Sequence, residues 1–189
     1  MKKVLIIGGL ILAFVLVAIL GKGEEPVYLE GKHIVELDIK DYGKITLELD
    51  ADKAPITVTN FINLVNEKYY DGLKFHRIME GFMMQGGDGK DVKSIKGEFE
   101  SNGVKNDISH VRGVISMART NEPNSASSQF FIVHEDSTFL DGEYAAFGHV
   151  IDGIEVVDKV CKDSKPIDDN GTIKSSEMPI INYIRVQNN

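Results

Sequence analysis

Residues 75–89 read FHRIMEGFMMQGGDG, two short extended runs separated by a Glu-Gly pair and followed by a glycine-rich exit. Because successive side chains of a strand point to opposite faces, Phe75, Arg77 and Met79 are expected to share one face of the first run. In the second run Gln85 shares a face with a methionine, and large apolar groups again lie on both faces. An antiparallel sheet usually buries only one face, so the other face of these strands is predicted to form a binding groove.

A second stretch, SSQFFIV at residues 127–133, repeats this combination. Gln129 and Phe131 fall on one face, whereas Phe130 and Ile132 fall on the other face and are assigned to the core. One arginine, two glutamines, phenylalanines and a methionine supply no nucleophile, no pair of carboxylates and no set of metal ligands. Such a site can bind an apolar ring and donate hydrogen bonds without covalent chemistry, so we expect neither a metal nor a cofactor.

Length and composition narrow the classes of protein that remain. The 189 residues suffice for one well-cored domain with a short extension. The net charge of −8 argues against nucleic acid as a partner, because binding it requires Lys and Arg to neutralise phosphates. The single cysteine, Cys161, excludes an intramolecular disulfide and a cysteine-based zinc cluster. None of the five histidines has the spacing of metal ligands, and no G-x-S-x-G elbow supports a serine hydrolase.

The N-terminal segment indicates export. Two lysines precede an uncharged apolar run, residues 4–20, as in a secretory signal or a signal-anchor. The run is just long enough to span a bilayer, and its end lacks an A-x-A-like cleavage pattern. We therefore divide the chain into a signal-anchor or signal peptide (1–23), a tether (24–32) and a folded domain (33–187). We favour an uncleaved membrane anchor with the domain on the extracytoplasmic side; cleavage would instead release a secreted domain.

Hydrophobic periodicity predicts a β-rich domain with one helix early and one late. A further strand contains Gln129, and the segment 87–113 is predicted to consist of long loops that carry one short strand. A sheet closed on itself, with a helix at each end, explains this order better than a βαβ arrangement. The other strands are predicted at 33–40, 44–50, 73–79, 82–86, 114–118, 145–150 and 179–186, and the helices at 54–67 and 153–162.

Several motifs, in this order along the chain, resemble those of the cyclophilin family of peptidyl-prolyl isomerases. The resemblance extends over about residues 30–186. It implies a mainly β fold, a closed eight-stranded antiparallel β-barrel capped by two α-helices, with the site on its outer surface. In this chain an N-terminal hydrophobic helix would precede the barrel, and 33–187 would be the isomerase domain. The matching runs are FHRI (75–78), GFMMQGGD (81–88), ISMA (115–118), NSASSQFFI (124–132), LDG (140–142) and FG (147–148).

The resemblance also implies roles for individual residues. Arg77 matches the family's catalytic arginine, and Phe82 and Gln85 complete the set that we assign to catalysis. The proline ring would lie in an apolar pocket, and the backbone of residues 118–120 would hold the residue before proline. The residues assigned to substrate binding are Met83, Ala118, Arg119, Thr120, Gln129, Phe131, Phe139, Leu140 and Tyr144.

Three of these positions depart from the better-known animal pattern. Arg119 replaces an asparagine, but the family's contact there is largely through the main chain, so we expect little loss. Phe139 replaces a tryptophan and so removes an indole N–H donor. We therefore expect cyclosporin to bind, but more weakly than it binds relatives that carry the tryptophan. Tyr144 replaces a histidine, so no imidazole can act at that position.

These residues suit the isomerisation of X–Pro bonds. Rotation about a peptide bond faces a barrier of about 18–20 kcal/mol, and X–Pro bonds interconvert over roughly tens to hundreds of seconds. A fixed guanidinium can donate a hydrogen bond to the proline nitrogen only when the amide is twisted, so it favours the transition state over the ground state. We expect roughly 5–7 kcal/mol of such preference to give about 10⁴–10⁵-fold acceleration.

The sequence therefore predicts a peptidyl-prolyl cis-trans isomerase that assists the folding of exported proteins. Its expected partners are Pro-containing segments of unfolded or exported proteins and, through the N-terminal segment, the membrane; we expect a monomer. The alternative is a binding module of the same shape that holds Pro-containing peptides without important turnover. Arg77 favours the enzyme, because a module that only binds does not require a guanidinium directed at the amide nitrogen.

Overall fold

The structure is a computed structural model that describes residues 26–187. The predicted N-terminal hydrophobic helix, the signal-anchor or signal peptide (1–23) and the first two residues of the tether lie outside these residues. Within the described part of the chain, no helix combines the length and the apolar character needed to cross a membrane.

Residues 26–187 form eight β-strands and two α-helices, in the order that the hydrophobic pattern predicts. The short strand predicted within 87–113 is wrong: that segment contains only a single 3₁₀ turn, η1 (Glu100–Asn102), and a second one, η2 (Thr138–Leu140), follows β6. The strands are β1 (Lys32–Ile39), β2 (Gly43–Asp50), β3 (Phe75–Met79), β4 (Met83–Gly86), β5 (Val114–Met117), β6 (Phe130–Val133), β7 (Ala146–Asp152) and β8 (Ile181–Val186). The α-helices are α1 (Pro55–Asn66) and α2 (Ile154–Asp163).

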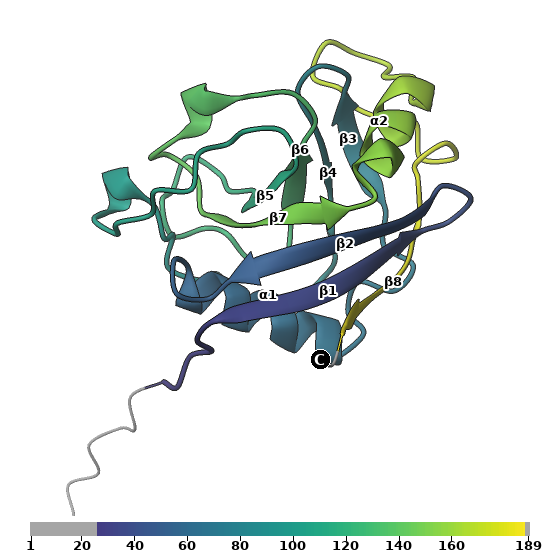
Figure 1. The fold of residues 1–189 in the computed structure, drawn as a ribbon. Helices are drawn as coiled ribbons and strands as arrows, with labels where there is room; N and C mark the ends of the chain where they lie inside the picture. The colour runs from purple at the N-terminus through teal and green to yellow at the C-terminus, as the bar shows by residue number, and fades with distance from the viewer. Residues whose placement is uncertain (1–25, 188–189) are drawn as a thin grey trace, which may run out of the picture.

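The eight strands form one antiparallel sheet in the order β3-β4-β6-β5-β7-β2-β1-β8, curled into a half-barrel (Figure 1). The predicted closed barrel is therefore wrong, because β3 and β8 are the two edges of this sheet. Next to these edges, an isolated bridge between Lys74 and Ile180 joins the segments that lead into the two strands. The N–H of Phe75 donates there to the carbonyl of Pro179 (3.0 Å), and the N–H of Ile181 donates to the carbonyl of Leu73 (2.8 Å). Beyond that bridge β3 pairs with a C-terminal loop instead: the N–H of Ile78 donates to the carbonyl of Gly171 (2.8 Å), and the N–H of Ile173 donates to the carbonyl of His76 (2.9 Å).

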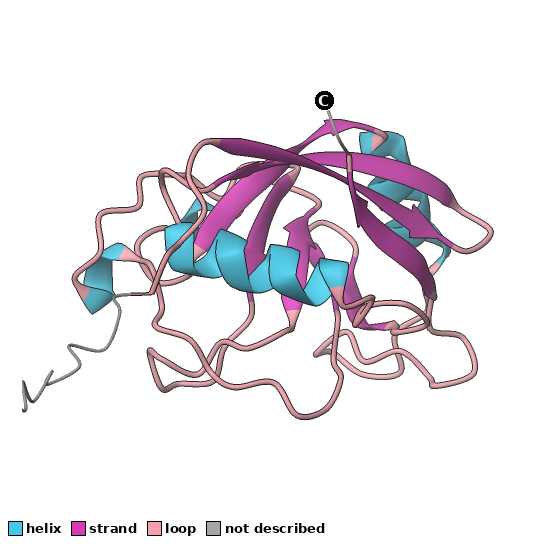
Figure 2. Cartoon of the chain, turned by 90° about the horizontal axis from the view of Figure 1, so that it is seen from below, coloured by secondary structure: helices cyan, strands magenta, loops and turns pink. Residues whose placement is uncertain are grey.

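The two helices lie at opposite ends of the curled sheet (Figures 1 and 2), and buried residues of both belong to the one main core. Helix α1 packs against β2 and β8, and α2 packs against β2 and β4. Pro55 at the first turn of α1 suits a helix start, because its missing N–H would have no partner there. The buried carboxylate of Glu98 accepts hydrogen bonds from the free N–H groups of Ile56 (3.0 Å) and Thr57 (2.7 Å). A carboxylate far away in sequence thus caps the helix and fixes it to the long loop that leads to β5.

The sheet presents two faces with different contents. On the inner face Ile78, Met84, Ile132 and Ile115 lie opposite one another on neighbouring strands, and all four are fully buried in the main core. This confirms the core assignment of Ile132 and of Phe130, which is also fully buried. A smaller apolar cluster covers the outer face, formed by Met83, Val114, Phe131, Val133, Leu140 and Ala146.

The strict alternation predicted for the first strand fails at one point. The pairing register of β3 with β4 shifts between Phe75 and Arg77. This irregularity turns Phe75 into the inner core, whereas Arg77 and Met79 stay on the outer face, where Met79 packs against the smaller cluster. The predicted common face of these three residues is therefore wrong, because a β-bulge breaks the two-residue repeat.

Candidate active site

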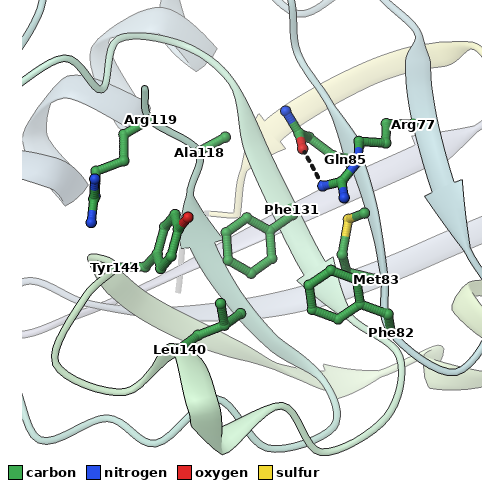
Figure 3. Close-up of a pocket in the computed structure, with 9 residues that line it drawn as sticks. All are labelled: Arg77, Phe82, Met83, Gln85, Ala118, Arg119, Phe131, Leu140 and Tyr144. Atoms are coloured by element: carbon green, nitrogen blue, oxygen red, sulfur yellow. Dashed lines mark hydrogen bonds between the residues drawn. The ribbon is translucent and has the colours of Figure 1, made fainter. Parts of the chain in front are cut away.

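An open pocket lies on the outer face of β3, β4, β6 and β5, and all nine residues that line it belong to the predicted site (Figure 3). It encloses about 110 Å³. Pockets for drug-sized ligands usually measure about 300–1,000 Å³, so this one suits a single small ring. The lining residues are Arg77, Phe82, Met83, Gln85, Ala118, Arg119, Phe131, Leu140 and Tyr144.

Strand register brings the lining residues together. Arg77 lies opposite Gln85, and Gln85 lies opposite Phe131, so three neighbouring strands contribute one row across the outer face. Figure 3 shows Phe131 at the centre of the site, between the Arg77 side and the Tyr144 side. Leu140, which is supplied by η2, closes the row from below in that view. Residues that are distant in sequence thus meet because the sheet curls and pairs in this order.

The guanidinium of Arg77 is held by three neutral partners. Its Nε donates to the carbonyl oxygen of Asn170 (2.7 Å), one Nη donates to Oε1 of Gln85 (3.3 Å), and the other lies 3.5 Å from the sulfur of Met79. The guanidinium also lies over the ring of Phe82, 5.8 Å from its centroid. Because none of these partners carries a negative charge, the arginine is fixed in position while its charge remains available to a ligand.

Two further residues of the predicted site, Thr120 and Gln129, lie beside the pocket rather than in it. They line an adjoining hollow of about 140 Å³, which shares Gln85, Ala118 and Arg119 with the main pocket. Gln85 donates from Nε2 to Oε1 of Gln129 (2.9 Å), so the two hollows are joined by a hydrogen bond between amides.

Phe139 is the one predicted site residue that lines neither hollow. It is 72% exposed, and its ring lies 5.5 Å from the ring of Phe82, centroid to centroid. The exposed Phe139 ring and the half-buried Phe82 ring form an apolar ledge at the rim of the pocket. A ligand that extends beyond the pocket would meet this ledge.

The Arg119 side chain has contacts that the sequence did not indicate. Its guanidinium lies 4.7 Å from the ring centroid of Tyr144 and 5.0 Å from that of Phe99. It donates from Nε to the carbonyl of Glu143 (2.9 Å) and from Nη1 to the carbonyl of Thr120 (2.8 Å). Arg119 therefore connects the segment that follows β5 to the Tyr144 wall, which is more than the main-chain role expected for this position.

A buried histidine behind the pocket was missed from the sequence. The His110 ring stacks on Phe131, with centroids 6.0 Å apart and planes 17° apart. Its Nδ1 lies 2.9 Å from Oδ1 of Asp141, and its Nε2 lies 3.0 Å from Oγ of Ser116. Both His110 and Ser116 are 0% exposed, so these contacts, which resemble a hydrolase triad, cannot reach a substrate. Their position indicates a structural role beneath the pocket floor.

Burial decides the charge of this histidine. Desolvation lowers the pKa of His110 below its ordinary value of 6.5, although the Asp141 carboxylate acts in the opposite direction. Burial alone would raise the pKa of Asp141, but hydrogen bonds from Ser109 and from the His110 backbone and ring lower it overall. At neutral pH the arrangement is therefore a neutral imidazole beside a charged carboxylate. The only signal in the sequence was the Leu140-Asp141-Gly142 turn, and nothing in that turn indicates that Asp141 contacts His110.

Comparison with known sequences identifies relatives along most of the chain. Residues 34–184 match the family described as "Cyclophilin type peptidyl-prolyl cis-trans isomerase/CLD". Peptidyl-prolyl cis-trans isomerase A of Dickeya dadantii is 48% identical over 130 residues, which are 62% of this chain and 66% of that protein. A probable peptidyl-prolyl cis-trans isomerase of Brucella suis is 40% identical over 159 residues, 77% of this chain and 79% of its own length.

Solved structures agree with these matches. A crystal structure of a cyclophilin-type peptidyl-prolyl cis-trans isomerase from Cryptosporidium parvum superposes with a TM-score of 0.72 at 29% identity, covering 84% of this chain and 99% of that one. A second structure of that protein, in the presence of the dipeptide Ala-Pro, gives a TM-score of 0.71 at 29% identity and covers 82% of this chain and 99% of that one. With a matching family profile, curated relatives and a shared fold, the chain belongs to the cyclophilin-type peptidyl-prolyl cis-trans isomerases, a family of isomerases.

Proposed function

We propose that this chain isomerises X–Pro bonds by binding the proline ring in the pocket and stabilising the twisted amide with Arg77. The observation that carries the proposal is the fixed guanidinium at the edge of a pocket sized for one small ring. Its neutral partners leave its positive charge uncompensated, so it can donate to a proline nitrogen that has gained a lone pair. The relative crystallised in the presence of Ala-Pro supports a ligand of this chemistry.

The chemistry requires only differential binding. A planar amide nitrogen has little electron density to accept a hydrogen bond, whereas the twisted nitrogen accepts one readily. The guanidinium therefore interacts more strongly with the transition state than with the ground state. Phe131, Leu140 and Met83 supply the apolar surface that holds the ring while the preceding carbonyl rotates. Phe82 and Gln85 keep the guanidinium in place.

The backbone of residues 118–120 is proposed to hold the residue before proline. Ala118 and Arg119 line both hollows, so this segment runs between them. The N–H groups of Ala118 and Thr120 already donate to the Gln129 carbonyl and to Ser125 Oγ, so the contacts proposed for the peptide are with the other main-chain groups of the segment. Gln129 and Thr120 extend the same surface, and Tyr144 closes it on the far side. A peptide would therefore place its proline in the pocket and its preceding residues along the adjoining hollow.

The proposed clients are unfolded segments of exported proteins. This rests on the lysines and the apolar run of residues 1–23, which are typical of a segment that anchors the 33–187 domain at the outer face of a membrane or directs its secretion. Cell fractionation tests the location: we expect the chain in the membrane fraction, with its body accessible to protease from the outer side. Recovery in the cytoplasm would contradict the proposal.

The decisive experiment measures the isomerisation rate of a short X–Pro peptide with the full chain and with Arg77→Ala. We expect kcat/KM to fall about 100- to 1,000-fold in the variant, the cost of removing one well-placed donor to a transition state. Arg77→Lys is the matched control, because it keeps the charge but not the planar fork that contacts Asn170 and Gln85. We expect it to recover only part of the rate.

The same assay separates the enzyme from a binding module. If the wild type and Arg77→Ala are both slow while the peptide still binds, the chain is a module that holds Pro-containing segments, and Arg77 is a recognition contact. A fast wild type with an equally fast Arg77→Ala variant would leave the activity intact and remove this arginine from the mechanism.

We also propose that cyclosporin binds this chain more weakly than it binds relatives with a tryptophan at the position of Phe139. The exposed Phe139 ring supplies apolar area but no N–H donor. Phe139→Trp is expected to tighten cyclosporin binding about 2- to 10-fold, the net effect of one hydrogen bond. Unchanged affinity in titration calorimetry, with peptide turnover also unchanged, would show that this donor is unimportant here.

A further inference from the structure

A chain of hydrogen bonds leads from the catalytic arginine to a carboxylate outside the pocket. Arg77 donates to Oε1 of Gln85 (3.3 Å), Gln85 donates from Nε2 to Oε1 of Gln129 (2.9 Å), and Gln129 donates from Nε2 to Oδ1 of Asp88 (3.0 Å). Asp88 lines neither hollow of the site. We propose that Asp88 is a positioning residue, which sets the orientation of both glutamine amides and through them holds Arg77 ready for the twisted amide.

The two ends of this chain of hydrogen bonds differ in polarity. A guanidinium can only donate hydrogen bonds, and an ionised carboxylate can only accept them. Each glutamine amide between them has one accepting and one donating end, so Asp88 and Arg77 together allow only one orientation of the pair. Gln129 turns its NH₂ group to Asp88 and its oxygen to Gln85, and Gln85 then presents its oxygen to Arg77. All three hydrogen bonds are satisfied in this arrangement alone.

The backbone around Asp88 is built to hold this carboxylate in place. A Cβ added to Gly87 would lie 3.0 Å from atoms of Phe130 and Tyr70, and φ at Gly87 is +78°. A Cβ added to Gly89 would collide with the hydroxyl of Tyr69. The two glycines thus let the chain pass close against aromatic rings on both sides of Asp88. The glycine-rich exit noted in the sequence thus fixes the path of the backbone that carries Asp88.

The consequence for catalysis is specific. Asp88 is exposed, so water can replace its oxygen, and simple loss of the side chain will be partly compensated. A donor at position 88 would instead reverse the direction of the hydrogen bonds in the chain from Arg77 to Asp88, which we call the relay. Gln129 and Gln85 would both rotate, and Gln85 would present its NH₂ group to the guanidinium, where two donors cannot bond. The inference rests on the proposed function, since it concerns how Arg77 is held for that reaction.

The test is a polarity series at position 88 in the full chain, assayed with an X–Pro peptide. Asp88→Lys is expected to lower kcat about tenfold, as for one lost hydrogen bond in the transition state, with KM within about twofold. Asp88→Asn keeps an accepting oxygen and removes the charge, so kcat should stay within about twofold of wild type. Glu122→Lys is the matched control, because Glu122 is exposed and lines neither hollow, yet lies on the loop next to Thr120. It makes the same change of charge and should leave kcat unchanged.

Two further measurements separate positioning from a general effect of charge. In a double-mutant cycle, Asp88→Lys should cause no additional loss in an Arg77→Ala background, because Asp88 acts only through that arginine. In NMR spectra, the side-chain amide signals of Gln85 and Gln129 and the Nε–H signal of Arg77 should shift in Asp88→Lys and stay in place in Glu122→Lys.

The outcomes distinguish this inference from the proposed function. If Arg77→Ala is slow but Asp88→Lys is within twofold of wild type, the relay is overturned and the catalytic role of Arg77 stands. Equal losses in Asp88→Lys and Glu122→Lys would also overturn it, as a charge effect. If Arg77→Ala is as fast as wild type, the proposed mechanism fails. In that case the relay is tested by NMR alone, and it is rejected if the side-chain signals of Gln85, Gln129 and Arg77 do not shift in Asp88→Lys.

Discussion

The two faces of the same strands are organised by different rules. On the inner face Ile78, Met84 and Ile132 are held by close packing, and each is fully buried. On the outer face Arg77 and Gln85 are held by directed hydrogen bonds and are only half-buried. A packed side chain is sensitive to loss of volume, whereas a hydrogen-bonded side chain is sensitive to the exchange of a donor for an acceptor. Stability and activity are therefore expected to respond to different substitutions on neighbouring residues.

The largest effect should come from the inner face. Ile132→Ala removes a fully buried side chain between β4 and β5 and should lower the free energy of unfolding by about 2–5 kcal/mol. Urea titration measures this loss, and the kcat/KM of the folded fraction should stay within about twofold of wild type. If Ile132→Ala lowers turnover as strongly as it lowers stability, the two faces are coupled more tightly than the packing indicates.

A second prediction concerns the loop of residues 170–173, which lies along the edge of β3 and contacts Arg77. Gly171 has φ of +83°, and an added Cβ would collide with Met79 and lie 2.8 Å from the carbonyl oxygen of Ile78. Gly171→Ala should therefore cost about 1–3 kcal/mol of stability and also lower kcat, because it displaces the Asn170 carbonyl that holds Arg77. Gly103→Ala is the matched control: φ there is +76°, but nothing lies within 4 Å. Equal kcat values for the two variants would contradict the role of Asn170.

A third, smaller effect should come from the outer face. Gln85→Leu keeps much of the volume but removes the acceptor for Arg77 and the donor to Gln129. We expect kcat to fall about tenfold while the free energy of unfolding changes by less than about 1 kcal/mol. A large loss of stability without a loss of kcat would mean that Gln85 contributes to the stability of the fold, as the inner-face residues do, and not to the positioning of Arg77.

The smallest effect is a pH dependence beneath the pocket floor. Because burial lowers the pKa of His110, the unfolded state binds a proton more readily, so stability falls as pH drops from above 6.5 towards the lower folded pKa. One histidine contributes at most about 1.4 kcal/mol per pH unit. His110→Gln should flatten the slope of stability between pH 7 and 5. His76, whose pKa is also lowered by burial, is expected to supply the part that remains.

The periodicity of the sequence was sufficient to predict the inner face, because burial imposes a two-residue repeat on every strand. It failed at Phe75, where a bulge that no residue type signals changes the register. The outer pocket could be assembled from resemblance and alternation. The residues that hold it, Asn170 through its carbonyl and His110 from beneath, could not, because main-chain acceptors and buried partners leave no pattern in sequence.

The closure of the sheet was overestimated for a related reason. Eight strands in sequence suggest a barrel, but the sequence does not show which segment pairs with the last edge. Here residues 171–173 occupy most of the free edge of β3, and the start of β8 pairs with residues 72–74, just before β3 begins. Local pattern identifies strands well, whereas pairing across about a hundred residues depends on loop geometry that the pattern does not contain.

That occupied edge has a consequence for the handling of extended substrates. An exposed strand edge would let any extended peptide join the sheet as a further strand, with a ladder of main-chain hydrogen bonds that favours retention. Here the donors and acceptors of β3 beside Arg77 are already used by residues 171–173. A peptide at the proposed site would therefore gain no main-chain ladder along β3 and would be held by its proline in the pocket and by its preceding residues along the adjoining hollow. We therefore expect a segment bound at the proposed site to dissociate quickly, which suits an isomerase that acts on many chains in succession.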